Sequence, residues 1–552
     1  MKKSTLTFLV LFLIYPIQFV SPSHNSNKPK ARIQDEKSVQ EGIREYIDQL
    51  EGSGSIKLSK QKIIGNPVLT KLYSDADYQP VWVNARNRKD LVELLEGAYF
   101  EGLNPEDYHI DYIREHGRKL EEGVRVSMDD YAMADIIMSN AILTFAFHMI
   151  QGKVNAEALD PNWNYSQRIV PDDVEFRLTQ RLETGTLKEV AARIRPELPM
   201  YGKLRRWFAK LDSIQKAGGD IQPIEYPGIA LRPGDSLPAV KALKNHITSY
   251  GFEFSDPENE KFDEELEEAI RDFQMINGLD ADGICGKATY KALNVSLDER
   301  LDIIRVNMER CRWINNDLPG EFLLVNIADY RLYLFRDRNI DYECRVVVGK
   351  EFHETPVFSS DIKYVVFNPT WTVPYSIASK EILPKLKKDP NYLQNRNITL
   401  LKGKEEIDPS TVDFTQYSQN SFPFTLRQEP GPNNALGLVK FIFPNKHAVY
   451  LHDTPSKSYF EKTDRAFSHG CVRVKDPFIL AEQLLGDKGY DSEKIAEVIK
   501  TKEMKNVYLS KPMPVMIMYW TCYENDKDGM IYFFRDIYGR DKKILTELNR
   551  DR

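Results

Sequence analysis

Apolar residues recur at three- and four-residue steps over the N-terminal part of the chain. The clearest stretches are DLVELLEGAYF (90–100), YAMADIIMSNAILTFAFHMIQGK (131–153) and YGKLRRWFAKLDSIQ (201–215). This period is typical of amphipathic helices that bury one face against each other. The pattern predicts a helical domain over residues 35–220 with a scaffolding role. His148 lies inside one apolar face, so we expect a core histidine with a hydrogen-bond partner.

A second helical pattern covers residues 228–295 and predicts a small separate module. Asp235 and Asp263 stand where helix N-caps are expected. The stretch DADGICGKATY begins like a calcium loop, but no acidic residue closes it at the twelfth position, so we expect no metal there. Helical spacing is kept by six apolar residues, namely Val240, Leu243, Leu266, Ala269, Ile270 and Phe273.

From about residue 300 the apolar residues alternate with polar ones, which is typical of strands. The segment 321–350 contains three such runs, and residues 515–534 form a hairpin pattern with Asp528-Gly529 at the turn. We therefore expect a β-rich domain over residues 300–552. Residues 376–437 interrupt it with a helix and a polar stretch rich in proline and asparagine, which is either a lid over an active site or a plain surface excursion.

The N-terminus has the layout of a secretory signal. Lys2 and Lys3 precede an uncharged apolar run that ends near Val20 and contains Pro16. The run is shorter than the roughly 20 residues needed to span a bilayer, so we expect residues 1–23 to be cleaved, with an uncleaved anchor as the alternative. No other stretch is expected to cross a membrane.

Charge and cysteine content exclude several classes of protein. Lys+Arg 75 against Asp+Glu 82 gives a net charge of -7 without a basic cluster, which argues against nucleic-acid binding. No CxxC pair indicates zinc. The 5 cysteines are too few for a disulfide scaffold, and Cys285, Cys311, Cys344 and Cys522 permit two disulfides in three ways or none; we favour free thiols.

The fifth cysteine stands in AFSHGCVRV (466–474), directly after a histidine and a glycine. A thiol at its free pKa is only a few per cent thiolate at neutral pH, so nucleophilic use requires a base or a cation nearby. In KHAVYLHDT (446–454), alternation buries Val449 and Leu451 and turns His452 to the other face. His452 and His469 are both candidate bases, and spacing does not choose between them.

Two resemblances to known families follow from these residues. The module at 228–295 resembles a peptidoglycan-binding domain in its LRPGD opening (231–235), its NGL stretch (277–279) and its close at Leu293-Asn294; a helical spacer without ligand is the alternative. His452 followed by Ser468-His469-Gly470-Cys471-Val472-Arg473 resembles the signature of L,D-transpeptidases, cysteine enzymes that cross-link peptidoglycan. With the helical region, the module and the insertion, the chain looks like the large Gram-negative type.

The resemblance implies a multidomain α+β fold. Its parts are a helical scaffold domain, a small three-helix peptidoglycan-binding domain and a β-rich catalytic domain with residues 376–437 as an inserted lid. It also implies that Cys471 is the nucleophile and His452 the general base and later acid. The amides of His469, Gly470 and Cys471 then form the oxyanion pocket, and the carbonyl of Asp453 orients His452. No metal or other cofactor is expected.

Roles for the surrounding residues remain more open. Arg473 either attracts the carboxylate of the donor peptide or supports the loop by hydrogen bonds to backbone. Tyr450 and Trp371 line the cleft or belong to the core, and Ser468 hydrogen-bonds around His469 beside the substrate. We expect His353 and His447 to be surface residues.

The family function implied is 3→3 cross-linking, in which a tetrapeptide donor stem is passed to a diaminopimelate-type amine with release of D-alanine. An exported cysteine peptidase or carboxypeptidase that trims wall peptides, and a noncatalytic wall-binding scaffold, are the alternatives. We expect an exported, periplasmic monomer that binds peptidoglycan stems and glycan, works beside other wall-synthesis enzymes and is acylated by carbapenems.

Overall fold

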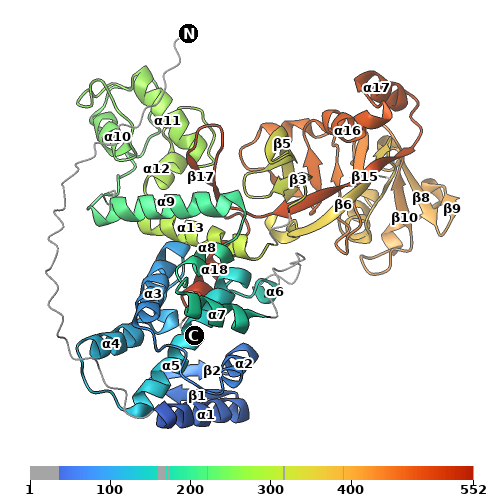
Figure 1. The fold of residues 1–552 in the computed structure, drawn as a ribbon. Helices are drawn as coiled ribbons and strands as arrows, with labels where there is room; N and C mark the ends of the chain where they lie inside the picture. Colours follow the sequence, from blue (N-terminus) through green and yellow to red (C-terminus); the bar gives the residue numbers. More distant parts are fainter. Residues whose placement is uncertain are drawn as a thin grey trace.

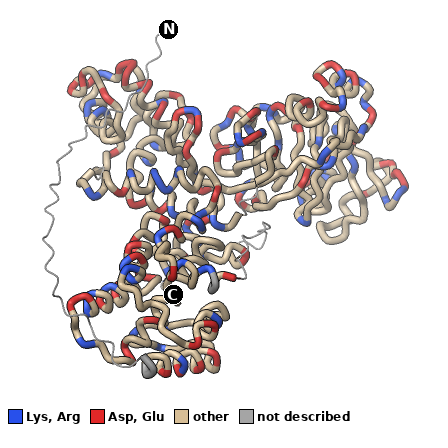
Figure 2. Tube along the Cα trace, viewed as in Figure 1, with Lys and Arg blue, Asp and Glu red and all other residues tan. Residues whose placement is uncertain are grey.

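The computed structural model describes residues 36–159, 170, 173–219, 222–314, 318–389 and 391–550. The expected signal at residues 1–23 lies outside this part of the chain. Figure 1 shows a helical half, with the small module above it, joined to a β-rich half that extends to one side. Lys and Arg are interspersed with Asp and Glu along the described trace (Figure 2).

Helices make up the first region, apart from one small hairpin of β1 (Ser55–Leu58) and β2 (Gln61–Ile64). The apolar stripes of these helices face one shared core, as their period predicts. The helices are α1 (Glu36–Ser53), α2 (Pro67–Asp75), α3 (Ala85–Glu96), α4 (Ile110–Glu121), α5 (Met128–Gln151), α6 (Ala156–Leu159), α7 (Val174–Thr184), α8 (Glu189–Ile194) and α9 (Pro199–Lys216).

The helix α5 forms the centre of this region. By length and composition it is apolar enough to cross a membrane, contrary to the expectation that no stretch after the N-terminus is. However, 78% of its most apolar window is buried inside the protein, which is the behaviour of a core helix. His148 on this helix is buried and lies 3.0 Å from the Tyr108 hydroxyl, so the prediction of a core histidine with a partner is confirmed.

The module after residue 228 has its own hydrophobic core. It consists of α10 (Pro238–Thr248), α11 (Glu264–Ile276) and α12 (Lys287–Leu293). Asp263 caps α11 by accepting from the amide of Leu266, as predicted. Asp235 is not a helix cap, because its carboxylate accepts from the amide of Arg232 in the turn before α10.

The β-rich region is built on a mixed sheet with the strand order β13-β5-β14-β12-β11-β6-β15-β3-β4. The strand β4 also pairs with β5, so the sheet closes on itself around a buried apolar interior. The strands are β3 (Glu321–Asn326), β4 (Arg331–Arg336), β5 (Asn339–Gly349), β6 (Phe358–Phe367), β11 (Val439–Ile442), β12 (Leu451–His452), β13 (Ala466–Ser468), β14 (Val472–Val474) and β15 (Lys505–Met518). The helices α16 (Pro477–Leu485) and α17 (Ser492–Lys500) follow β14.

The insertion is a folded unit rather than a helix followed by a polar loop. It has a four-stranded antiparallel sheet in the order β7-β10-β8-β9 and a hydrophobic core of its own. Its sheet begins before residue 376, with β7 (Trp371–Thr372). The other elements are α14 (Tyr375–Ile377), a π-helical turn (Ala378–Ile382), α15 (Leu383–Leu386), β8 (Ile398–Lys402), β9 (Glu405–Ile407) and β10 (Thr425–Gln428).

The C-terminal segment returns from the sheet to the helical half. The predicted hairpin is present as β16 (Cys522–Glu524) and β17 (Ile531–Phe533) and packs against α11. It leads to α18 (Arg540–Leu548), which packs against α13 (Leu297–Arg312), the long helix between the module and the sheet. The predicted fold class, with helical, module and β-rich regions, is therefore confirmed.

Candidate active site

Three adjacent strands place the polar residues of the motif on one side of the sheet. The register pairs Lys440 of β11 with His452 of β12, and His452 with Arg473 of β14. The next row, Phe441, Leu451 and Val472, is fully buried. Because successive side chains point to opposite faces, one face of these strands belongs to the core and the other carries the candidate chemistry.

Cys471 lies directly before β14, beside Tyr450. The amide of Val472 donates to the carbonyl of Tyr450 over 3.1 Å and fixes the two segments together. The sulfur accepts hydrogen bonds from the hydroxyl and the backbone amide of Tyr450 and lies 3.8 Å from the carbonyl oxygen of Ala448. The thiol is therefore held on the tyrosine side of the face.

Burial raises the pKa of the Cys471 thiol above its ordinary value, because a thiolate is poorly solvated there. The hydrogen bonds from Tyr450 and the positive charges of Lys440 and Arg473 act in the opposite direction and lower it. Burial is the largest of these effects, so the resting residue is a thiol that needs activation before it can attack.

His452 is buried, with 4% of its surface exposed. Its Nδ1 lies 2.5 Å from the carbonyl oxygen of Asp453, which makes Nδ1 the protonated nitrogen. Burial, followed by the charge of Arg473, lowers the pKa of His452 to about 3. The imidazole is therefore neutral at physiological pH.

The carboxylate of Asp453 has separate partners. It accepts hydrogen bonds from the amides of Leu438 (2.9 Å) and Thr454 (2.7 Å) and pairs with Lys457. The backbone carbonyl that holds His452 is thus independent of the side chain, which instead ties the segment after β12 to the loop before β11.

The expected base and nucleophile share a face but do not touch. Within the part of the chain that the structure describes, no hydrogen bond joins His452 to Cys471: the ring is held by the carbonyl of Asp453, and the sulfur lies beside Tyr450. The rings of Tyr450 and His452 are neighbours, with centroids 5.5 Å apart.

The turn that carries Cys471 is held by Ser468. Its hydroxyl donates to the carbonyl of Cys471 (2.6 Å) and accepts from the amide of Gly470 (3.0 Å). The predicted local hydrogen bonding of Ser468 around His469 is therefore present, but the residue is only 2% exposed, so its expected place beside the substrate is corrected. The Gly470 amide is also not aimed at open space, so only the amides of His469 and Cys471 stay in the proposed oxyanion pocket.

The glycine in this turn meets a conformational requirement. Gly470 has φ +109°, which L side chains rarely adopt, and its carbonyl accepts a hydrogen bond of 2.9 Å from Thr355. Thr355 also accepts from the amide of Gly349 over 2.9 Å. Thr355 therefore joins the end of β5 to the turn that carries Cys471.

The insertion contacts both sides of the thiol. Glu381, in the π-helical turn, lies 2.8 Å from Nε2 of His469. The indole of Trp371 on β7 hydrogen-bonds the hydroxyl of Tyr450. Trp371 and Tyr450 are partly buried between the insertion and the sheet, so they line the site rather than the main core. These contacts place the insertion over the cysteine turn.

Arg473 is the third residue of the row that begins with Lys440 and His452. Its Nε makes no hydrogen bond in the described residues, and the guanidinium lies 5.9 Å from the Tyr459 ring centroid. The hydrogen bonds to backbone that one hypothesis required are not found. Of the other predicted surface histidines, His353 is exposed, whereas His447 is half-buried against Phe358.

Cys471 differs from the other cysteines in accessibility. All five are free, as favoured from the sequence, and the remaining four are buried. Burial raises the pKa of Cys285 and Cys311 to about 12 and that of Cys344 to about 11, and it raises the pKa of Cys522 further. A reagent in solution therefore has one reachable thiol.

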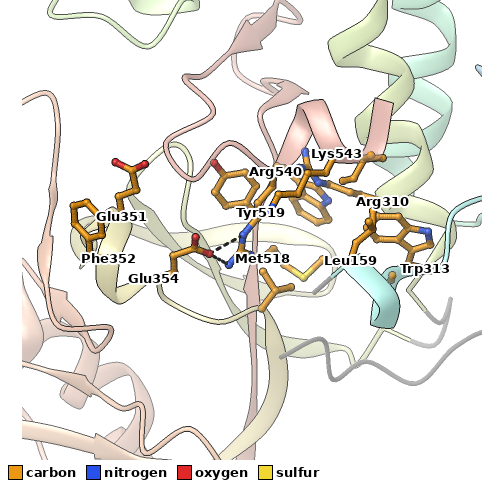
Figure 3. Close-up of a pocket in the computed structure, with 14 residues that line it drawn as sticks. Leu159, Arg310, Trp313, Glu351, Phe352, Glu354, Met518, Tyr519, Arg540 and Lys543 are labelled. Atoms are coloured by element: carbon orange, nitrogen blue, oxygen red, sulfur yellow. Dashed lines mark hydrogen bonds and ion pairs between the residues drawn. The ribbon is translucent and has the colours of Figure 1, made fainter. Parts of the chain in front are cut away.

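A cavity of about 440 Å³ lies on the other side of the turn after β5, between α6, α13 and α18 (Figure 3). The ion pair of Glu354 with Arg540 crosses it, and exposed Phe352 stands at one end. Neither Cys471 nor His452 lines this cavity. It belongs to the junction of the two halves and not to the thiol site.

Sequence reasoning did not single out Lys440, Glu381 or Thr355. A signal for Lys440 exists in Val439-Lys440-Phe441, where a lysine alternates with two buried residues on a strand. No local pattern marks Glu381 or Thr355, since their contacts join segments that are distant in sequence.

Three family models match successive parts of the chain. They are a "Scaffold domain" at residues 67–207, a "Putative peptidoglycan binding domain" at 236–293 and an "L,D-transpeptidase catalytic domain" at 320–504. The last contains β11, β12, β14 and the whole insertion.

Individual proteins agree with this order. A "Putative L,D-transpeptidase" of Haemophilus influenzae is 26% identical over 503 residues, which cover 90% of this chain and 82% of that protein. An N-acetylmuramoyl-L-alanine amidase of Mycobacterium tuberculosis is 39% identical over 80 residues, or 13% of this chain and 20% of that protein.

Solved L,D-transpeptidase structures are also similar to parts of this chain. That from Stackebrandtia nassauensis is 16% identical, covers 52% of this chain and 94% of its own and has a TM-score of 0.21. That from Xylanimonas cellulosilytica is 13% identical, covers 53% and 100% and has a TM-score of 0.18. Such low scores carry no weight for the architecture. On these matches, the chain contains an L,D-transpeptidase catalytic domain and a peptidoglycan-binding domain, and over most of its length it is homologous to a putative L,D-transpeptidase.

Proposed function

We propose that the protein forms 3→3 cross-links in peptidoglycan by cysteine acyl transfer. The observation that carries the proposal is the position of Cys471, a partly exposed thiol between Tyr450 and two unpaired cations on one face of a catalytic-domain sheet. Acyl transfer needs a nucleophile, a proton acceptor and donors for the oxyanion, and this face offers each of them.

In the first half-reaction the Cys471 sulfur attacks the carbonyl carbon of the third residue of a donor tetrapeptide. A sulfur–carbon bond forms, and the negative charge moves to the carbonyl oxygen, which accepts from the amides of His469 and Cys471. The carbon–nitrogen bond to the terminal D-alanine then breaks, and the leaving amine takes the proton that His452 accepted from the thiol.

In the second half-reaction an amine of a second stem attacks the thioester. His452 accepts the proton from this amine, a carbon–nitrogen bond forms and the sulfur–carbon bond breaks, which restores the thiol. Water in place of the amine gives a tripeptide. The insertion, whose own core makes it a stable cover over the cysteine turn, is proposed as the lid that favours the amine.

The other domains suit a protein that works in the cell wall. We propose that the module of α10–α12 binds peptidoglycan glycan and that the helical region positions the catalytic domain. The proposed setting is the periplasm, after export by the N-terminal segment, with other wall-synthesis enzymes nearby and the protein acting as a monomer.

The first test uses purified full-length protein and disaccharide-tetrapeptide muropeptides, with the products measured by mass spectrometry. We expect a cross-linked dimer and free D-alanine from the wild type, and neither from Cys471→Ala. A carbapenem should add one acyl group to the wild type and none to Cys471→Ala.

The matched control is Cys344→Ala, which removes a buried cysteine of the same domain and should retain activity. Tripeptide without dimer would identify a peptidase and contradict the cross-linking proposal. Absence of every product and of the carbapenem adduct would identify a noncatalytic wall-binding protein.

A further inference from the structure

Lys440 lies close to the reactive thiol although it is outside the motif. It stands opposite His452 in the β11–β12 register, and its Nζ lies 3.7 Å from the centroid of the Tyr450 ring. The hydroxyl of the same tyrosine donates to the sulfur of Cys471. The ammonium, the phenol ring and the sulfur therefore lie next to one another across neighbouring strands.

The charge of Lys440 has no acidic partner. Among the residues that the structure describes, no carboxylate forms an ion pair with Lys440 or with Arg473, the other cation of this face. On the β6 side, the residue opposite Lys440 is the apolar Val366. Burial lowers the pKa of Lys440, and the nearby Cys471 raises it.

Cys471 is the group on this face that can supply the missing negative charge. The titratable neighbours on the β12 side are Tyr450 and His452, and those on the β14 side are Cys471 and Arg473. Burial raises the pKa of Tyr450 far above its usual range, and His452 is neutral. Ionisation of the thiol would therefore pair two charges that are each unfavourable alone.

A neutral imidazole cannot provide the positive charge that stabilises a thiolate. Many cysteine nucleophiles are stabilised as a thiolate by a protonated histidine, but burial keeps His452 unprotonated here. The Lys440 ammonium, held over the ring of Tyr450, can supply that positive charge instead.

We propose that Lys440 is the electrostatic partner of the Cys471 thiolate. Its ammonium stabilises the sulfur anion that attacks the donor stem, and Tyr450 fixes the two groups relative to each other. Lys440 is a positioning residue, since it acts through Cys471 and does not touch the substrate. The part concerning the donor stem rests on the proposed function, whereas stabilisation of the thiolate does not.

The test is the pH profile of Cys471 alkylation by iodoacetamide in the full-length protein, followed by intact mass. Lys440→Met should move the profile to higher pH and slow alkylation on the order of ten-fold at neutral pH, because a cation near a thiol raises the thiolate fraction. Lys440→Arg should keep a profile close to the wild type. The matched control is Lys363→Met, which removes an exposed lysine of the neighbouring strand β6 and should change nothing.

A folded Lys440→Met protein with the wild-type profile would overturn the inference. If Lys440→Met does not fold, the pH profile of alkylation is measured on Lys440→Gln instead, and the same two outcomes apply. Alkylation does not depend on transpeptidation: a profile that depends on Lys440 in a protein that makes no muropeptide product would refute the proposed function and leave this inference in place. If the protein makes the cross-linked product but the pH profile of its alkylation does not depend on Lys440, the proposed function stands and this inference is refuted.

Discussion

The sulfur of Cys471 is surrounded by groups with opposite effects on its pKa. Burial raises it, and Tyr450, Lys440 and Arg473 lower it. His452 contributes no charge, because burial lowers its pKa to about 3. The imidazole is thus neutral at rest and supplies no positive charge to hold a thiolate.

The buried His452 predicts a pH-dependent stability. Its pKa is lowered from 6.5 to about 3, so the unfolded chain binds a proton that the folded protein excludes. The stability that the neutral ring contributes to the folded protein is fully present above pH 6.5, the unfolded pKa. It is lost as the pH falls from 6.5 towards 3. We expect the free energy of unfolding to fall by about 3 kcal/mol at two pH units below the unfolded pKa.

The measurement is hydrogen exchange at the amides of β11 and β12, compared between wild type and His452→Asn at each pH. The wild type should lose more protection on acidification than the variant. The amides near His116, a buried scaffold histidine whose pKa is lowered to about 4, should respond alike in both proteins. Equal responses in β12 would contradict the prediction.

For single residues of the candidate site, the sequence predicts the main chemical groups but not all of their contacts. The motif indicates Cys471 and His452, and alternation correctly buries Val449 and Leu451. It does not reveal Lys440, because that neighbour depends on the order β11-β12-β14. It also misplaces Ser468, since a turn serine that bonds its own loop looks the same in sequence as one that faces a substrate.

Among the elements, the insertion has the strongest link to the reaction outcome. Its core and sheet make it a rigid cover, and it reaches the cysteine turn through Glu381 and the thiol through Trp371 and Tyr450. π-helical turns, such as the one that carries Glu381, frequently occur at functional sites.

Glu381→Gln is expected to weaken the contact between the lid and His469. Loss of a charged hydrogen-bond acceptor loosens the cover, so water should compete better for the thioester and the tripeptide-to-dimer ratio should rise about three-fold or more. Product ratios from muropeptide digests, determined by mass spectrometry, provide the measurement.

The control is Glu405→Gln, which changes an exposed carboxylate on β9 of the same insertion. An unchanged ratio in a folded Glu381→Gln protein, or an equal rise in Glu405→Gln, would show that this contact does not govern water access.

The sequence predicts elements well where the apolar period is long. The three strands after residue 320, the hairpin at Asp528-Gly529 and the main helices are present. The strands β8 and β10 were missed because they are short and separated by proline- and asparagine-rich turns. Asp235 was taken for a cap because an aspartate before a proline-led helix also suits a turn.

In the whole molecule, buried polar contacts join the first domain to the last helix. Lys153, with 1% of its side chain exposed, pairs with Asp107 at 2.7 Å and donates to the carbonyl of Leu548 at 2.7 Å. Arg310 of α13 pairs with Asp541 of α18 at 2.6 Å. The helical half therefore contains both ends of the described chain.

Lys153→Met is expected to destabilise this junction. It leaves the Asp107 carboxylate buried without its cation, and breaking a buried pair costs about 3 kcal/mol or more. Thermal unfolding of the full-length protein should begin at a lower temperature, with the loss of protection starting at α5 and α18 in hydrogen exchange. Lys57→Met, on the exposed side of β1, is the control and should unfold like the wild type. Identical unfolding of both variants would contradict this account.

The position of α18 has a consequence for how the protein matures. Chains are made and exported from the N-terminus, and domains commonly fold in that order. Here a late-arriving helix fills a place against α13 and beside α6, so the earliest domain finishes packing only after the catalytic sheet has been delivered. Completion of the helical half and completion of the β-rich half are therefore linked through this one helix.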